Sequence, residues 1–322
     1  MTSYPLKFEP ILKEKVWGGN KLKTNLNKET TSSNVGESWE ISGVLDNIST
    51  VKNGCYKGQT LNKLLHTHTE EFLGAKNYSK FGNQFPLLVK FLDAKTNLSV
   101  QVHPDDKLAS QYNSFGKTEM WYIMDCDENA EIILGMKESC KTTEVLRTID
   151  ATNVYDVFNA VTVNKGDHYF IPAGEVHAIG SGILAAEIQQ TSDITYRVYD
   201  WNRTDKKGNT RQLHTEQAIA ATKMNCKKEA ANTTPNSSKN SSLVTCEYFT
   251  TNMLHLHREV IKNYEHLDSF IIFMCVEGTA TIATEDGSVY LNAGNTTLVP
   301  ACSKEVKFYT NNAKLLEVYI AA

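Results

Sequence analysis

A fifteen-residue pattern occurs twice in this chain, and no other feature limits the possible folds as strongly. Residues 163–177 read VNKGDHYFIPAGEVH, and residues 291–305 read LNAGNTTLVPACSKE. Each copy has a glycine, then a run typical of a β-strand, and then a proline that closes a turn. Four residues recur at matching positions: Asn164, Gly166, Pro172 and Ala173 return as Asn292, Gly294, Pro300 and Ala301. An internal repeat of this kind predicts two copies of one β-structural unit.

Strand patterns also dominate the rest of the chain. Short β-branched and aromatic runs fill the C-terminal part, residues 243–322, separated by Gly, Asp-Gly or Asn-Asn, which is typical of an antiparallel sandwich or barrel. The first part mixes similar runs with helical patterns. Residues 60–74 place apolar side chains at helical spacing behind Thr60, a suitable N-cap, and residues 142–149 and 214–224 predict two more short helices. We therefore expect a mainly β fold with short helical insertions in the first part.

One polar stretch divides the chain. Residues 227–242 read KKEAANTTPNSSKNSS, in which more than half of the side chains are those of Asn, Ser or Thr and none is large and apolar. Such a stretch cannot bury enough surface to offset the entropy lost on ordering it, so we expect a linker or an exposed loop. The division leaves residues 1–226 as one predicted domain and residues 243–322 as another.

The composition limits the partners and the compartment. A net charge of −4 gives no general attraction to nucleic acid or anionic membranes, and the longest apolar run, from Phe270 to Val276, is far shorter than the roughly 20 residues needed to cross a bilayer. The N-terminal segment carries Pro5, Glu9 and Glu14 where a signal peptide needs an apolar block. The seven cysteines form no C-x-x-C pair, which indicates reduced, mostly buried thiols. We expect a cytoplasmic protein.

The first copy of the repeat resembles a known fold family. It matches the pattern G-x5-P-x-G-x2-H, the second motif of the cupin jelly roll, through Gly166, Pro172, Gly174 and His177. In the second copy the last two of these positions are Cys302 and Glu305. The chain thus resembles a double-barrel cupin, and the resemblance implies a metal-binding first barrel in residues 1–226 and a metal-free second barrel in residues 243–322.

The cupin resemblance also suggests a metal site. The first cupin motif normally supplies an H-x-H pair and a later glutamate. Gln101 and His103 stand at the pair, at the end of a predicted strand whose alternation puts both on one face. Glu119 follows later than in a simple cupin, after an inserted turn and short helix. Together with His177, these residues offer two nitrogen ligands and two oxygen ligands, with one negative charge in total. Such a set suits one Zn²⁺ or another borderline divalent ion, with coordination positions left open for substrate.

Four longer blocks resemble type I mannose-6-phosphate isomerase, and most closely its short bacterial form. They are residues 86–106, 116–123, 171–180 and 187–203, in the family's order. Residues 16–19 and 36–42 resemble its N-terminal blocks, and the resemblance spans about residues 5–220. It implies a zinc-dependent aldose–ketose isomerase that interconverts mannose 6-phosphate and fructose 6-phosphate through a metal-stabilised enediolate. It also implies that His103, Glu119 and His177 bind the zinc, with Gln101 coordinating more variably.

The resemblance assigns four residues to the chemistry. Lys90 and Lys117 match pocket lysines, and either could be the base, because a lysine that is desolvated beside a cation has a lowered pKa. Arg197 matches the active-site arginine, and its charged, planar group suits the phosphate or the developing oxyanion. Asp193 matches a catalytic-site carboxylate, which could orient Arg197 or help to open the sugar ring.

Three further residues are candidates for substrate contact. Trp17 and Trp39 could form an apolar wall for the sugar or pack in the core, and Glu187 could bind substrate or only line the barrel. The expected partner is a small sugar phosphate, and we expect a monomer or a weak homo-oligomer. An iron cupin oxygenase is disfavoured by Gln101 and by the late position of Glu119. A non-catalytic sugar-binding cupin would be favoured by a missing ligand or lysine, and none is missing.

Overall fold

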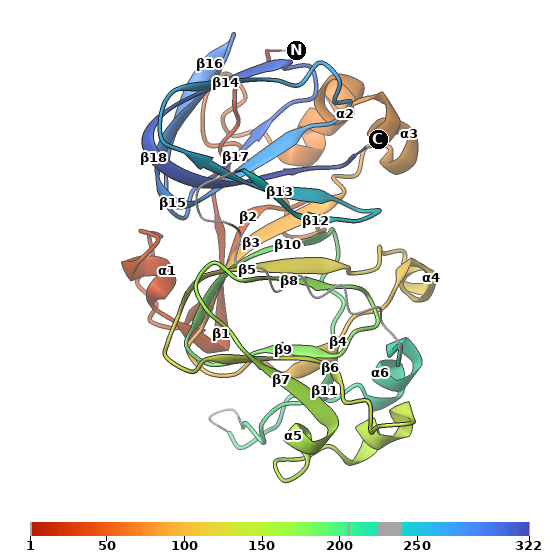
Figure 1. The fold of residues 1–322 in the computed structure, drawn as a ribbon. Coiled ribbons are helices and arrows are strands. Elements are labelled where there is room, and N and C mark those ends of the chain that lie inside the picture. Colours follow the sequence, from red (N-terminus) through yellow and green to blue (C-terminus); the bar gives the residue numbers. More distant parts are fainter. Residues whose placement is uncertain (1, 205–206, 225–239, 322) are drawn as a thin grey trace.

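The computed structural model describes residues 2–204, 207–224 and 240–321 and shows two stacked β bodies (Figure 1). All strand pairings are antiparallel and build three sheets with six, five and seven strands. The mainly β, double-barrel architecture with short helical insertions that the sequence predicts is confirmed. None of the helices in these residues is long and apolar enough to span a membrane.

The lower body in Figure 1 consists of two sheets that face each other across an apolar core. The six-stranded sheet has the order β1-β2-β3-β10-β5-β8. Its strands are β1 (Ile11–Gly19), β2 (Val35–Ile41), β3 (Leu87–Ala94), β10 (Ile183–Gln190), β5 (Glu119–Cys126) and β8 (His168–Ile171). The five-stranded sheet consists of β11 (Tyr196–Tyr199), β4 (Val100–Val102), β9 (His177–Ile179), β6 (Glu131–Met136) and β7 (Phe158–Thr162), in that order.

The upper body is built on the seven-stranded sheet, and its interior is a separate apolar core that includes Phe273 and Phe308. Its strands are β12 (Ser241–Thr245), β13 (Thr250–Leu256), β14 (Val260–Asn263), β15 (Ile271–Thr284), β16 (Gly287–Asn292), β17 (Thr296–Val299) and β18 (Glu305–Tyr319). Most of the predicted linker, residues 227–239, lies outside the described residues. Its last two residues, Ser241 and Ser242, already pair with β13 as the start of β12.

The centre of the six-stranded sheet is buried on both faces. Every residue of β3 and β10 is buried, because one face lines the first barrel and the other packs against the second. Along β3, Leu87, Val89 and Phe91 belong to the core between the two barrels, whereas Leu92 belongs to the core inside the first. Lys90 shares the face of Leu92, since side chains alternate along a strand.

The N-terminal segment and two helices belong spatially to the upper body (Figure 1). Leu6 exchanges backbone hydrogen bonds with Leu298 of β17, at 2.7 and 2.9 Å. Helix α2 (Leu61–Leu73) begins after Thr60, whose hydroxyl accepts the Lys63 amide as the sequence predicts, and it is followed by α3 (Ala75–Phe81). The apolar face of α2 enters the core between the barrels.

The remaining helices are short. They are α1 (Lys21–Thr24), α4 (Asp106–Ala109), α5 (Val154–Val157), α6 (Thr215–Ala221) and the 3-10 helices η1 (Ser110–Tyr112) and η2 (Thr143–Thr148). The insertion predicted before Glu119 is thus α4 with η1, and the helix predicted at residues 142–149 is a 3-10 helix. The six described cysteines are free thiols, but only Cys275 is buried, so the prediction of mostly buried thiols is wrong.

The sequence repeat is also a structural repeat. Strand β17 occupies the same positions in the second copy as β8 does in the first. The turn before each strand contains a glycine with positive φ, Gly166 at 96° before β8 and Gly294 at 88° before β17. Only glycine adopts such angles without a steric penalty, which explains why both copies keep it. His177 begins β9 and Glu305 begins β18.

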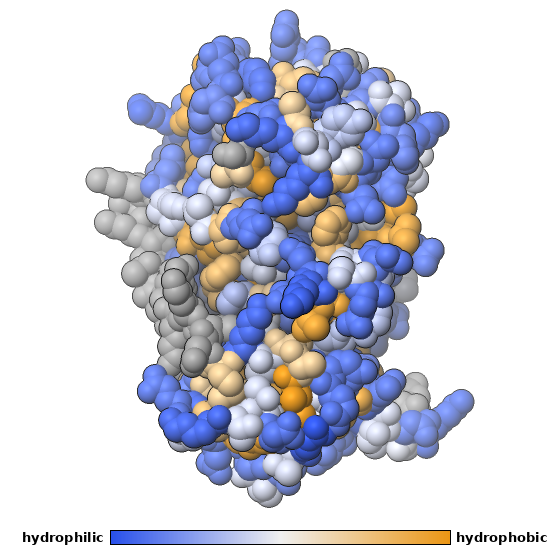
Figure 2. Space-filling model, turned by 90° about the vertical axis from the view of Figure 1, so that its right-hand side faces the viewer, coloured by the Kyte–Doolittle hydropathy of each residue, from blue (hydrophilic) through white to orange (hydrophobic). Residues whose placement is uncertain are grey.

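Outer surfaces differ clearly from these cores. The face shown in Figure 2 is largely hydrophilic, and its apolar residues lie in small, separate groups. It therefore presents no broad apolar surface of the kind that marks a stable interface.

The contact between the barrels generates a stability prediction. Phe85, which precedes β3, and Phe270, which precedes β15, are both fully buried, with ring centroids 4.9 Å apart. Phe270→Ala should lower the free energy of unfolding by about 3–5 kcal/mol, because it leaves a cavity in this shared core. Chemical denaturation should still show one transition. Tyr290→Ala, at a side chain that is 59% exposed, is the control and should change the value by less than about 0.5 kcal/mol.

Candidate active site and metal centre

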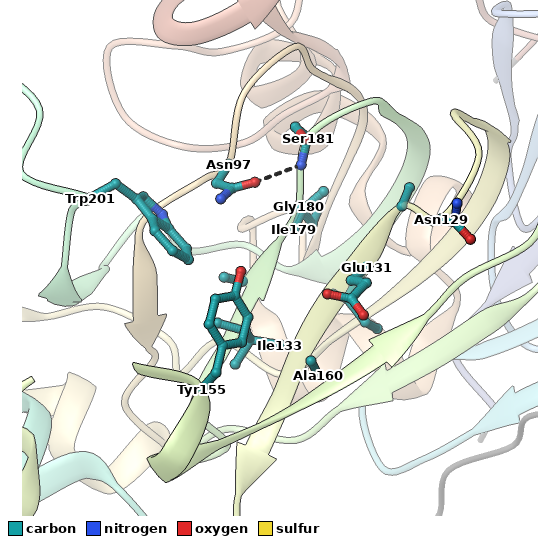
Figure 3. A pocket seen from close by; sticks show the side chains of 13 residues that line it. Asn97, Asn129, Glu131, Ile133, Tyr155, Ala160, Ile179, Gly180, Ser181 and Trp201 are labelled. Atoms are coloured by element: carbon teal, nitrogen blue, oxygen red, sulfur yellow. Dashed lines mark hydrogen bonds between the residues drawn. The ribbon is translucent and has the colours of Figure 1, made fainter. Parts of the chain in front are cut away.

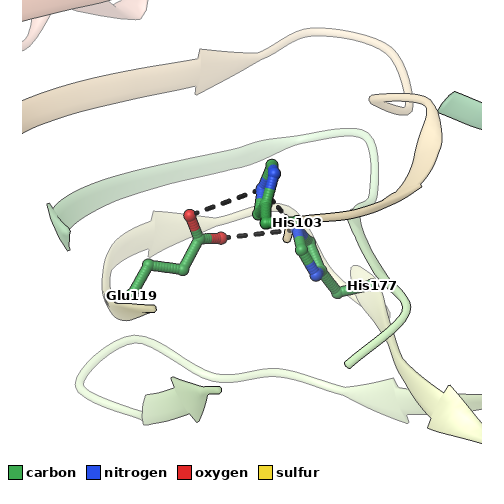
Figure 4. Close-up of side chains that lie close together, drawn as sticks. All are labelled: His103, Glu119 and His177. Carbon is green, nitrogen blue, oxygen red and sulfur yellow. Dashed lines mark hydrogen bonds and ion pairs between the residues drawn. The ribbon is translucent and has the colours of Figure 1, made fainter. Parts of the chain in front are cut away.

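Three predicted ligands converge inside the first barrel: His103, Glu119 and His177 (Figure 4). Their ligand atoms lie within 4.8 Å of one another. The Nε2 atoms of the two histidines are 3.1 Å apart, and the Glu119 carboxylate oxygens lie 3.6 Å from His103 Nε2 and 3.4 Å from His177 Nε2. All three side chains are almost completely buried. The described part of the chain holds no other group of three such residues.

Strand pairing explains how residues far apart in sequence meet. Gln101 on β4 pairs directly with His177 on β9, so the end of β4 brings His103 next to the β9 histidine. The His103 carbonyl accepts a hydrogen bond of 2.9 Å from the amide of Gly174, in the turn before β9. Glu119 begins β5 in the facing sheet. The two sheets of the barrel therefore supply the ligands from opposite sides.

The hydrogen bonds of both imidazoles suit metal binding. His103 Nδ1 lies 2.8 Å from the Ile194 carbonyl and His177 Nδ1 lies 2.8 Å from the Glu175 carbonyl. A carbonyl only accepts, so each Nδ1 carries the proton and each Nε2 presents a lone pair to the other residues. Burial, reinforced by the Lys117 charge, lowers the pKa of His177 to about 3 and that of His103 well below its usual value. Both rings are therefore neutral, which metal binding requires.

The carboxylate completes the fit. Glu119 Oε1 is buried and has no hydrogen-bond partner within the described residues. Burial raises the pKa of Glu119 to about 7, against the opposing effect of Lys117. The two imidazole lone pairs and the unpartnered carboxylate oxygen therefore face one point. A divalent cation at that point would be coordinated by all three.

Gln101 and Lys117 border this group. Gln101 Nε2 lies 3.4 Å from His177 Nε2, and its Oε1 accepts from Ser99, so the amide would have to turn to present oxygen to an ion. Lys117 Nζ donates to Glu119 and lies 3.0 Å from His103 Nε2. The lysine therefore contacts two of the three candidate ligands.

A cavity of about 320 Å³ opens beside the group. Gln101 and Lys117 line it, together with six other residues that the sequence assigns to the site: Trp17, Trp39, Lys90, Glu187, Asp193 and Arg197. The structure thus brings eight of the eleven predicted residues to one cavity and the other three to its buried side. Sequence reasoning missed three charged residues of the lining: Lys15, Glu37 and Arg211.

Lys90 forms a buried ion pair. Its Nζ donates to Glu187 at 2.9 Å, and Glu187 also accepts from the Trp121 indole at 3.1 Å. Burial favours the neutral lysine, but Glu187 and Glu37 outweigh it and raise the Lys90 pKa above its usual value. Burial likewise disfavours ionised Glu187, yet Lys90 and Lys117 lower its pKa to about 2. The pair is therefore an ammonium and a carboxylate at neutral pH.

The two tryptophans have different surroundings. Trp17 packs in the core of the first barrel and reaches the cavity at its edge. Trp39 donates to Glu37, and its ring lies under Lys90 Nζ at 5.1 Å from the centroid. Trp17 therefore contributes both to the core and to the cavity wall.

The opposite wall carries two arginines. Arg197 on β11 donates from Nη1 to the Gln212 carbonyl at 2.7 Å, while its buried Nε has no partner in the described residues. Burial, and then the charge of Arg211, lower the Arg197 pKa, but a guanidinium stays charged. Asp193 lines this cavity and also a neighbouring one of about 350 Å³.

A further cavity of about 200 Å³ lies elsewhere on the first barrel (Figure 3). Tyr155 and Trp201 border it, with ring centroids 6.3 Å apart, and Glu131 lies across from them. None of the predicted site residues lines it. The predicted site residues therefore gather at the cavity of about 320 Å³ beside the histidines.

Comparison with protein families agrees with this geometry. Residues 6–139 match the family described as "Phosphomannose isomerase type I, catalytic domain", and residues 239–320 match "Mannose-6-phosphate isomerase, cupin domain". The two matches fall on different parts of the two-barrel fold.

Individual relatives cover most of the chain. It is 37% identical over 306 residues to the putative mannose-6-phosphate isomerase YvyI of Bacillus subtilis, and this alignment covers 94% of each sequence. It is 44% identical over 217 residues to the mannose-6-phosphate isomerase of Streptococcus mutans, covering 67% of this chain and 66% of that protein. The crystal structure of the mannose 6-phosphate isomerase from Bacillus subtilis superposes with a TM-score of 0.83 at 33% identity, covering 98% and 99% of the two chains.

The convergence of the three ligands generates a metal-binding prediction. Protein loaded with Zn²⁺ and dialysed should retain about one ion per chain, and His177→Ala should weaken binding at least tenfold, because partners behind a ligand alone contribute about 10–100-fold. Elemental analysis and competition with a chelator measure this. His266→Ala, at an exposed histidine, is the control. Equal zinc retention by His177→Ala and the unchanged protein would contradict the site.

Proposed function

The chain belongs to the type I mannose-6-phosphate isomerase family, and on this premise we propose that it interconverts mannose 6-phosphate and fructose 6-phosphate. The observation that carries the proposal is the group of His103, Glu119 and His177 beside a cavity lined by paired charges. Isomerisation moves a proton between C1 and C2, so it needs an electrophile at the carbonyl and a group that transfers the proton.

We propose that these three residues, with Gln101 as a variable fourth ligand, hold one divalent ion, and that the ion is zinc. Neutral imidazoles and one carboxylate form the donor set that zinc favours at catalytic sites. A bound divalent ion would polarise the substrate carbonyl and stabilise the charge of the enediolate. The carbonyls of Ile194 and Glu175 keep both imidazoles in the tautomer that leaves Nε2 available.

We assign the proton transfer to Lys117 because of its position. Its Nζ contacts both Glu119 and His103, so it lies beside the ligands that would hold the ion and faces a substrate bound to that ion. Lys90 instead donates to Glu187, which is not one of the candidate ligands, and is held as an ammonium. Its role is then to orient Glu187, whose carboxylate can accept a hydrogen bond from a substrate hydroxyl.

The cavity walls supply the remaining contacts. Trp17 and Trp39 offer aromatic surface to the sugar, and Arg197 offers charge to the substrate on the opposite side. We assign to Asp193, on the segment before β11, either ring opening or the orientation of Arg197. We propose that residues 243–322 form the metal-free second barrel, that the protein acts in the cytoplasm, and that it is a monomer or a weak homo-oligomer.

An assay coupled to fructose 6-phosphate formation tests the proposal. Metal-replete protein should convert mannose 6-phosphate, chelation should abolish turnover and added zinc should restore it. His177→Ala should lack measurable turnover, whereas His266→Ala should keep the full rate. If the metal-replete protein forms no fructose 6-phosphate, the proposed function is wrong.

Substitution of the two lysines tests the assignment of the base. Lys117→Met should lower kcat by about 10²–10⁴-fold with zinc retained, which is the usual contribution of general acid–base catalysis. Lys90→Met should lower kcat less, because it only releases Glu187. If Lys90→Met loses more of its kcat than Lys117→Met does, Lys90 is the base instead. If both variants keep the full kcat, neither lysine is the base.

A further inference from the structure

The charges around the cavity are unevenly balanced. Each of its three lysines has a carboxylate partner: Lys15 lies 2.9 Å from Glu37, Lys90 lies 2.9 Å from Glu187, and Lys117 contacts Glu119. These pairs neutralise the side of the cavity formed by β1, β2, β3, β5 and β10 and the segment just before β5. The opposite wall carries Arg197, Arg211 and Asp193, and no ion pair joins Asp193 to either arginine within the described residues.

Two guanidinium groups share the Asp200 carboxylate, and a third, that of Arg197, lies on the same wall. Arg211 donates from Nε to Asp200 at 2.7 Å and from Nη2 to the second oxygen of the same carboxylate. Arg203 also donates to Asp200. Arg197 lines the same cavity as Arg211, and its guanidinium donates to the carbonyl of the neighbouring Gln212 and not to this carboxylate. The three arginines, set against Asp200 and the Asp193 carboxylate of the same wall, leave one net positive charge.

Two of these arginines face the cavity. Arg197 and Arg211 line it, whereas Arg203 points away and donates to the carbonyl of Asn97. Asp200 occupies Nε and Nη2 of Arg211, which fixes the plane of the guanidinium and leaves Nη1 without a partner in the described residues. The buried Nε of Arg197 is likewise unpartnered there. An anion between the two would receive donors from both.

We infer that Arg211 and Arg197 together bind the phosphate of the sugar phosphate substrate, with Asp200 as the positioning residue of Arg211. This inference rests on the proposed function and extends it, because it names the residue that distinguishes a phosphorylated sugar from a neutral one. Planar guanidinium groups match the oxygens of a phosphate dianion, and each can donate to it from an N–H that has no other partner. With its phosphate held there, the substrate extends across the cavity toward Lys117 and the metal group.

Arg211→Gln in the metal-replete enzyme tests the inference. It should raise the KM for mannose 6-phosphate by about 10–100-fold, the loss expected for a hydrogen bond to a charged group, and change kcat by less than about threefold. The inhibition constant of inorganic phosphate should rise by a similar factor. Arg211→Lys should recover part of both losses, because it restores the charge without the planar fork.

Arg147→Gln is the matched control. Arg147 is also paired with a carboxylate, that of Glu216, and its side chain is 42% exposed against 31% for Arg211, but it does not line the cavity. This variant should leave KM and phosphate inhibition unchanged. If Arg211→Gln also leaves both unchanged, or lowers kcat as strongly as it raises KM, Arg211 does not bind the phosphate and the inference is overturned.

Direct titration with inorganic phosphate separates this inference from the proposed function. Calorimetry should detect phosphate binding to the unchanged protein and weaker binding to Arg211→Gln, even if no isomerase activity is found. If the unchanged protein is an active isomerase but Arg211→Gln binds phosphate normally, the proposed function stands and only this inference is wrong. Asp200→Asn should raise the KM by a smaller factor than Arg211→Gln, and thermal denaturation checks that each variant is folded.

Discussion

The alternation of side chains in the six-stranded sheet is the constraint on which the rest of the structure depends. One face of β3, β5 and β10 contributes apolar residues to the core between the barrels, and the other contributes Lys90, Glu119 and Glu187 to the interior of the first. Glu187 is the cross-strand partner of both Lys90 and Trp121. A shift of one residue in register would send the charged groups into the apolar core, so burying the outer face fixes the geometry of the site.

Burial on both faces also determines the electrostatics of the site. The candidate ligands and the Lys90–Glu187 pair are removed from water, where charges interact more strongly and an unpaired charge is very unfavourable. This explains why the lysines of the cavity have carboxylate partners and why both histidines are neutral. Glu119 Oε1 and Arg197 Nε are two of the buried atoms that have no hydrogen-bond partner within the described residues. In the proposed function the first would contact a cation and the second an anion.

Much of this could be predicted from sequence, because the decisive signals are local. The repeated turn glycine and strand, the Thr60 cap and the ligands on neighbouring strands follow from short motifs and from alternation. Lys15, Glu37 and Arg211 could not be predicted in the same way. Arg211 acquires its position only through Asp200, and Lys15 and Glu37 meet across β1 and β2. The spacing of these residues along the chain does not indicate that they share a cavity. Their proximity becomes visible only in the folded structure.

The second barrel shows what the repeat contributes besides a metal site. Its equivalent of His177 is Glu305, whose side chain is 55% exposed and lies near Lys307, and its interior is filled by apolar residues such as Phe273 and Phe308. Its outer face, with Ile272 and Met274, packs on the six-stranded sheet. The second barrel is therefore filled inside by apolar residues, and on its outside it covers the apolar face of the six-stranded sheet.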